Sequence, residues 1–170
     1  MKTMLKSAFL TSALIGFASL SAPGYSAENS ALWKHRVKGD FNTVLTNLKA
    51  GLEAKQFQIT AEENMSKGLE NNKKVFGENK WNSIGFQNVT VVHFCSLVFN
   101  HEVYNINMDY AVLCPFKAVV YNMKVKPDQI TIQMTRPTYL VAQYQHPKAK
   151  EIGKKIEDKI VAAIKEAVAH

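Results

Sequence analysis

The chain has 170 residues, a formal net charge of +7 and two cysteines. This length suits one domain. The charge is modest and dispersed along the sequence, whereas nucleic-acid-binding proteins gather basic residues on one face beside aromatic stacking partners. We therefore expect no nucleic acid partner and interpret the charge as that of a solvated surface.

Residues 1–26 have the pattern of a secretory signal peptide. Lys2 and Lys6 supply positive charge without an acid, an apolar stretch follows from Ala8 to Leu20, and small residues precede Ala27. The stretch is too short and too interrupted by small polar residues to span a bilayer, which needs roughly 20 predominantly apolar residues. We expect cleavage and export to a bacterial periplasm or beyond, with no stable membrane anchor. An uncleaved amino-terminal anchor is the alternative.

The mature chain predicts a single domain over residues 30–169, beginning with a strand at Leu32–Val37. Asp40 has the position and chemistry of a helix N-cap. The residues after it repeat at helical spacing and place five apolar side chains on one face, namely Phe41, Val44, Leu45, Leu48 and Leu52.

A short strand is predicted next, because Phe57 and Ile59 alternate with polar residues. The stretch 61–85 is polar and rich in Asn and Lys. It predicts a short helix around Met65–Asn71 and a loop that carries Trp81.

The segment Asn88–Cys95 predicts an interior strand, because it is apolar on both faces. A helix is expected to follow over Ser96–Asn105. One side of the strand carries Val89, Val91, His93 and Cys95, and the other carries Thr90, Val92 and Phe94.

Two antiparallel strands, Phe116–Tyr121 and Gln129–Thr135, come next, with Pro127-Asp128 as the predicted turn and Arg136-Pro137 as the end of the second strand. From about Pro147 the sequence predicts a long amphipathic helix. We therefore predict an α+β fold, a single two-layer domain with a mostly antiparallel sheet packed by helices, including this C-terminal helix. Its buried stripe is predicted to be Ile152, Ile156, Ile160, Ala163, Ile164 and Ala167.

The order of these landmarks resembles domain-of-unknown-function family 302 over nearly the whole mature chain. The resemblance rests on a strand ending in Phe94-Cys95, on Leu113-Cys114-Pro115 before the next strand, and on Arg136-Pro137 before the terminal helix. Lys55-Gln56-Phe57 follows the first helix where members often have Lys-Gly-Phe. The resemblance implies a small α/β domain, often paired as a homodimer, and no established activity.

Candidate site residues gather around the two cysteines. His93 and Cys95 share a strand face, His101 and Met108 lie in the connecting segment, and Cys114 follows nineteen residues after Cys95. In an oxidising compartment such a pair is most simply a structural disulfide. A reactive or regulatory thiol pair is one alternative, and a soft metal such as cuprous copper, held by Cys, Met or His, is another. His93 alone is also compatible with a core histidine.

Signatures of catalysis are absent from the sequence, which has no Cys-x-x-Cys, His-Glu-x-x-His, Gly-x-Ser-x-Gly or glycine-rich phosphate loop. We therefore expect a non-catalytic binding or assembly module of the cell envelope, without a cofactor. Its partner would be a second copy, a small ligand or an envelope protein. The alternative is a periplasmic thiol-redox or copper-handling protein that uses Cys95 and Cys114.

Overall fold

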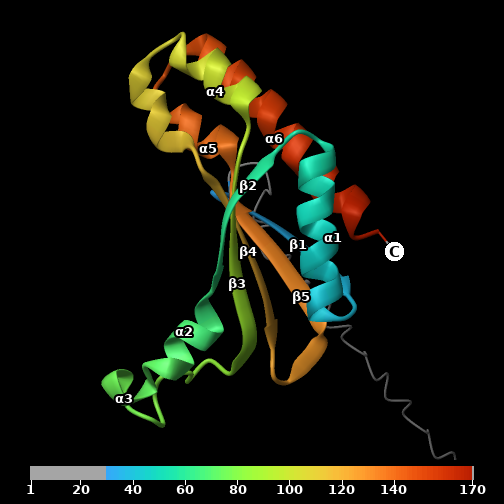
Figure 1. Ribbon diagram of the computed structural model, residues 1–170. Coiled ribbons are helices and arrows are strands. Elements are labelled where there is room, and N and C mark those ends of the chain that lie inside the picture. Colours follow the sequence, from blue (N-terminus) through green and yellow to red (C-terminus); the bar gives the residue numbers. More distant parts are fainter. Residues whose placement is uncertain (1–29, 170) are drawn as a thin grey trace, which may run out of the picture.

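The computed structural model describes residues 30–169, and the expected leader over residues 1–26 lies outside them. Five strands form one antiparallel sheet in the order β1-β5-β4-β3-β2. The predicted α+β architecture is confirmed (Figure 1). The elements in chain order are β1 (Leu32–Lys38), α1 (Phe41–Ala54), β2 (Gln58–Asn64), α2 (Met65–Asn71), α3 (Lys73–Phe76), β3 (Phe86–Cys95), α4 (Leu97–Tyr104), the 3-10 helix η2 (Met108–Leu113), β4 (Phe116–Met123), β5 (Lys126–Thr135), α5 (Pro137–Ala142) and α6 (Pro147–Ala167).

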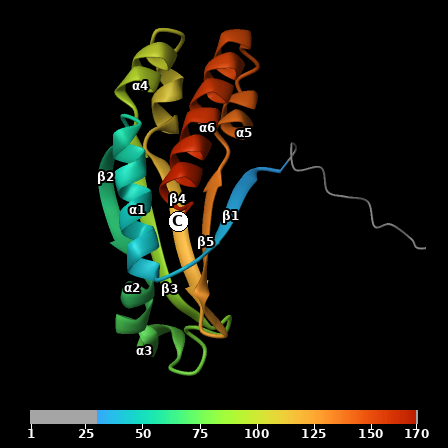
Figure 2. The same ribbon diagram turned by 90° about the vertical axis from the view of Figure 1, so that its right-hand side faces the viewer.

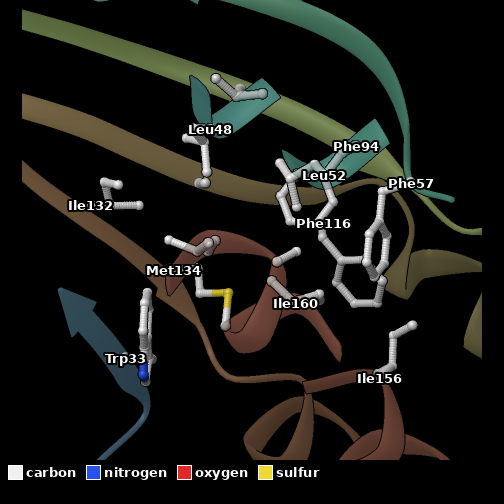
Figure 3. Close-up of a cluster of buried hydrophobic side chains, with 14 of the residues drawn as sticks. Trp33, Leu48, Leu52, Phe57, Phe94, Phe116, Ile132, Met134, Ile156 and Ile160 are labelled. Carbon is white, nitrogen blue, oxygen red and sulfur yellow. The ribbon is translucent and has the colours of Figure 1, made fainter. Parts of the chain in front are cut away.

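Helices α1 and α6 lie side by side on one face of the sheet, which we call the covered face (Figures 1 and 2). The apolar stripe predicted for α1 is buried there throughout. On α6, the predicted Ile152, Ile156, Ile160 and Ile164 are buried as well. Figure 3 shows these helices contributing side chains to the same core as the strands. None of the helices in residues 30–169 has the length and apolar character needed to cross a membrane.

The two covering helices approach each other closely at Gly51 of α1. A Cβ atom at this position would collide with the Cβ of Ala167 and would lie 2.9 Å from the carbonyl oxygen of Ala163, both on α6. Only glycine allows this spacing without displacing one helix, so Gly51 helps to set the depth of the covered face.

Helix α1 begins where the sequence predicts. The Asp40 side chain accepts a hydrogen bond from the backbone N–H of Thr43 at 2.8 Å, as an N-cap does. The Thr43 backbone and hydroxyl hydrogen bonds favour the charged carboxylate and lower the pKa of Asp40 from its ordinary value.

Helix α1 ends in a Schellman motif in which Gln56 takes the position that glycine most often occupies in such motifs. Gln56 has a φ of 65°, in the left-handed region. Its N–H bonds to the Glu53 carbonyl at 2.9 Å, and the N–H of Phe57 bonds to the Leu52 carbonyl at 3.0 Å. The motif turns the chain so that Phe57 enters the core at the start of β2.

The turn between β4 and β5 is not at Pro127-Asp128, so that prediction was wrong. The turn is formed by Lys124 and Val125, and Pro127-Asp128 lies inside β5. The pairing slips near Asn122, whose side-chain amide donates to the carbonyl of Pro127 at 2.7 Å. This irregularity in the ladder accommodates a proline, which has no N–H to donate.

Three short helices were not predicted from the sequence. They are α3, η2 and α5, and each spans four to six residues. Local signals start two of them, because the Asn107 side chain caps η2 and Pro137 occupies the first turn of α5. Helices this short have too few turns to display an apolar period, which was the signal on which the longer elements were predicted.

Candidate functional site

Cys95 and Cys114 form a disulfide, and their Cα atoms are 5.8 Å apart. Cys95 is the last residue of β3, and Cys114 follows η2 directly before β4. Both cysteines are half-buried. The separation lies within the roughly 7 Å limit for a bridge that needs no backbone movement. In this state both sulfurs are bonded to each other, so neither is a thiolate.

The Cys95 end of the disulfide borders the start of α4. The Ser96 side chain caps this helix by accepting from the backbone N–H of Phe99, and the Asn100 side-chain amide donates to the Cys95 sulfur at 3.3 Å. A surface cavity of about 390 Å³ opens beside it. Leu97 and Val98, which line this cavity, are 74% and 51% exposed. The disulfide is thus reachable from solvent across an apolar surface.

The other predicted site residues are only partly brought together. His93 lies on the same side of β3 as Cys95, and its Nε2 is 3.3 Å from Glu63 Oε1 without a hydrogen bond. His101 lines a different cavity, beside Lys148 of α6. Met108 is 64% exposed on η2. Within residues 30–169, no group of three or more His, Cys, Asp or Glu side chains is placed to hold a metal ion.

The face of the sheet opposite α1 and α6, which we call the open face, was missed in the sequence analysis. Its centre is an apolar strip on β3 and β4 made of Val89, Val91, Val119 and Tyr121, all half-buried. Val91 pairs with Val119, and Val89 pairs with Tyr121, so the four side chains form a compact block. In Figure 1 neither covering helix lies on this face.

The edges of the open face carry opposite charges. Lys34 and Arg36 on β1 pair with Gln133 and Thr131 of β5, whose side chains lie on this face. Glu63 on β2 pairs with Val91 at the other edge. The open face therefore runs from a basic edge through an apolar centre to an acidic edge.

The sequence contained part of the signal for this surface. It predicted Asn88–Cys95 as an interior strand that is apolar on both sides, and β3 does lie between β4 and β2. A strand buried on both faces would need helices on both sides of the sheet. The long helices α1 and α6 both pack on one side, and the second apolar side of β3 is left without such a cover.

Comparison with protein families gives one match, over residues 33–167, to the family described as "Domain of unknown function DUF302". A solved structure described as the uncharacterized conserved protein DUF302 from Bacillus stearothermophilus has a similar fold, with a TM-score of 0.68 and 21% sequence identity. The alignment covers 81% of this chain and 98% of that one. The search of curated proteins gives no significant match.

Proposed function

The chain belongs to the DUF302 family, and from that premise we propose that it is a non-catalytic binding or assembly module of the cell envelope that pairs with a second copy through the open face. The observation that carries this proposal is the half-buried strip of Val89, Val91, Val119 and Tyr121 on the sheet face that neither α1 nor α6 covers. An apolar strip rimmed by polar residues is typical of an interaction surface.

The charges at the edges of the open face favour a second copy as the partner and determine how the two copies are oriented. Two copies packed face to face, with a two-fold axis parallel to the strands, place the basic β1 edge of each over the acidic β2 edge of the other. An axis across the strands would instead place like charges together. Sheets commonly pack in this way with nearly aligned strands. The same patch on both subunits is the usual arrangement of a symmetric dimer.

The oligomeric state of the mature protein, measured by size exclusion with light scattering, tests this pairing. We expect a dimer, and we expect Val91→Asp to yield a folded monomer because it places charge in the apolar strip. The matched control is Val75→Asp on α3, where the side chain is 79% exposed. This control should remain a dimer. A monomeric wild type at high protein concentration would contradict the proposal.

A charge exchange tests the orientation. Lys34→Glu and Glu63→Lys should each weaken the dimer, and the double variant should restore it. Lys34 and Glu63 of the same chain cannot form this pair, because four strand spacings of about 4.8 Å separate β1 from β2 across the sheet. Two single variants that leave the dimer unchanged would contradict this orientation.

Export is the second part of the proposal. The disulfide supports it, because such bonds persist in oxidising compartments. Intact-mass analysis of protein from the envelope fraction should give a chain that begins within a few residues of Ala27. A full-length mass in the membrane fraction would indicate a retained anchor instead.

A thiol-redox function is the second candidate, and the position of the Cys95–Cys114 disulfide beside an open cavity favours it. Asn100 donates to the Cys95 sulfur, and this contact would also stabilise a thiolate at Cys95 after reduction. A copper-handling function would require the reduced pair, because metals bind the thiolate form. Thiol counting on the isolated protein with and without reductant, beside elemental analysis, separates a structural bond from both alternatives.

A further inference from the structure

A third cavity lies at the end of the sheet where β4 begins and β5 ends. It has a volume of about 360 Å³, is open to solvent on one side and is lined by η2, α5 and the adjoining strand ends. Small-ligand sites usually measure roughly 300–1,000 Å³, so this one suits a small molecule. The residues that define it are Val112, Pro115, Lys117, Thr135, Leu140 and Tyr144.

Most of the cavity wall is apolar and is held in place by the core. Leu113 and Phe116, which also line it, are buried in the hydrophobic core. The ring of Tyr144 packs against the buried Tyr110, with centroids 4.4 Å apart, and its hydroxyl donates to the Asp109 carbonyl at 3.5 Å. Val112, another apolar residue that lines the cavity, is 76% exposed.

The polar side chains that line the cavity are Lys117, Thr135, Gln143 and Tyr144. Gln143 donates to the Tyr139 carbonyl at 3.4 Å and Tyr144 donates to the Asp109 carbonyl, so Lys117 and Thr135 are left to bind a ligand. Lys117 on β4 and Thr135 on β5 lie one step beyond the Ala118–Met134 pair, on the open face. Neither side chain has a hydrogen-bond or ion-pair partner within residues 30–169, and no acidic residue lines the cavity. A single unpaired lysine beside an apolar wall complements one negative charge, whereas a polyphosphate would need several cations.

We propose that this cavity binds a small apolar monocarboxylate. Its hydrocarbon body packs between Val112, Leu140 and Tyr144, and its carboxylate accepts hydrogen bonds from Lys117 Nζ and Thr135 Oγ1. Lys117 lies on the open face two residues before Val119, so this ligand site borders the apolar strip through which we propose pairing. The two proposals are still distinguishable, because one is tested by ligand binding and the other by the oligomeric state.

The test is a titration of the mature protein with octanoate, kept below its micelle concentration, followed by NMR and calorimetry. Octan-1-ol and octylammonium are the matched probes of the same chain length. We expect octanoate to shift the resonances of Val112, Thr135 and Leu140 and to bind more tightly than octanol, with octylammonium weakest. Absence of shifts, shifts confined to other residues, or equal binding of octylammonium would overturn the proposal.

Two variants test separately where the carboxylate and the hydrocarbon body of the ligand bind. Lys117→Met should lower octanoate affinity about fivefold, the factor expected for a partly exposed ion pair of about 1 kcal/mol, and should leave octanol binding unchanged. Lys124→Met, in the β4–β5 turn, is the matched control and should change neither. Leu140→Trp should fill the cavity and abolish binding of both probes. If Lys117→Met and Lys124→Met change octanoate affinity by the same amount, Lys117 does not bind the carboxylate and the proposal fails.

Discussion

The two faces of the sheet are built from the same strands, yet they differ in what lies against them. Val92 and Val120 are fully buried on the covered face, in one core with α1 and α6. Val91 and Val119, their neighbours in sequence, are half-buried on the open face. Alternation along a strand therefore decides which side chains share a face, while the helices decide which face becomes the core. The covered face should carry most of the stability, and the open face most of the recognition.

The largest expected effect comes from placing the same charge on each face in turn. Val120→Asp buries an unpaired carboxylate, which costs several kcal/mol, a large share of the roughly 5–15 kcal/mol that holds a domain folded. Val119→Asp, one residue earlier, should stay folded and lose much less, namely the part of the stability that comes from the proposed pairing. Circular dichroism melts and soluble yield measure both. Equal destabilisation by the two variants would show that the open face is also part of the core.

The next largest effect concerns the contact that ties α6 to the end of β5. Glu157 is 6% exposed, pairs with Arg136 at 2.7 Å and accepts from the Thr138 backbone N–H at 3.1 Å. Glu157→Ala leaves the half-buried Arg136 without its partner and should cost about 3–5 kcal/mol in urea unfolding. Asp158→Ala is the control, because its ion pair with Lys154 is exposed and such pairs contribute about 0.3–0.5 kcal/mol.

A loss for Glu157→Ala no larger than that for Asp158→Ala would contradict the view that α6 is fixed to the sheet at this point. Glu157→Gln refines the result, because it keeps an oxygen acceptor for Thr138 and removes only the charge. We expect its cost to lie between those of the other two variants.

Variants of the disulfide test whether the open face, on which Cys95 lies, also contributes to stability. Its bond closes a loop of about 20 residues, which in the chain-entropy model stabilises a fold by about 3 kcal/mol. Cys95→Ser and Cys114→Ser should lose similar amounts, and the double variant should be no worse. Unfolding of the oxidised and reduced wild type gives an independent value. Normal melting of all three variants, together with lost thiol reactivity, would favour the redox function.

Much of the fold could be predicted from the sequence, because its main elements have strong local signals. The Asp40 cap with the Phe41–Leu52 stripe, and the isoleucine stripe of α6, both rest on helical periodicity and were confirmed. The β4–β5 turn was misplaced, because the Asn122 side chain that allows Pro127 inside β5 comes from the other strand of the hairpin. Sequence spacing does not reveal such a contact.

The candidate sites were harder to predict than the fold. The cysteine pairing was one of three alternatives, and only the 5.8 Å between the two Cα atoms shows that the chain brings them together. His101 lies in the segment between the cysteines but lines another cavity. The cavity at Lys117 combines residues from η2, β4, β5 and α5, two of which are short helices without a periodic signal. Sites of this kind depend on tertiary contacts between weakly predicted elements.

A smaller change in stability is expected at the C-terminal end of α1, where Gln56 has a strained backbone conformation. Gln56 has a φ of 65°, which favours glycine over residues with a Cβ atom. Gln56→Gly should raise the free energy of unfolding by about 0.5–1 kcal/mol, after the greater chain entropy of glycine is included. Gln58→Gly, in strand β2 and without a positive φ, should be destabilising. A loss of stability in both would mean that the Gln56 side chain, which accepts from Lys159 Nζ at 3.3 Å, outweighs the backbone strain.

The smallest expected effect is at the other end of α1 and depends on pH. Hydrogen bonds from Thr43 lower the pKa of Asp40 below its ordinary value of 3.8. The folded state therefore binds a proton at Asp40 less readily than the unfolded chain does. The charged cap adds stability above the unfolded pKa, and this contribution is lost as the pH falls through the folded pKa.

Asp40→Asn keeps a capping oxygen but removes the charge, so its melting temperature should lie slightly below the wild type at neutral pH. That gap should shrink as the pH falls below 3.8. Asp128→Asn, whose side chain makes no hydrogen bond within the described residues, should show no such gap. A gap of constant size across the acid range would assign the Asp40 effect to the geometry of the cap and not to its charge.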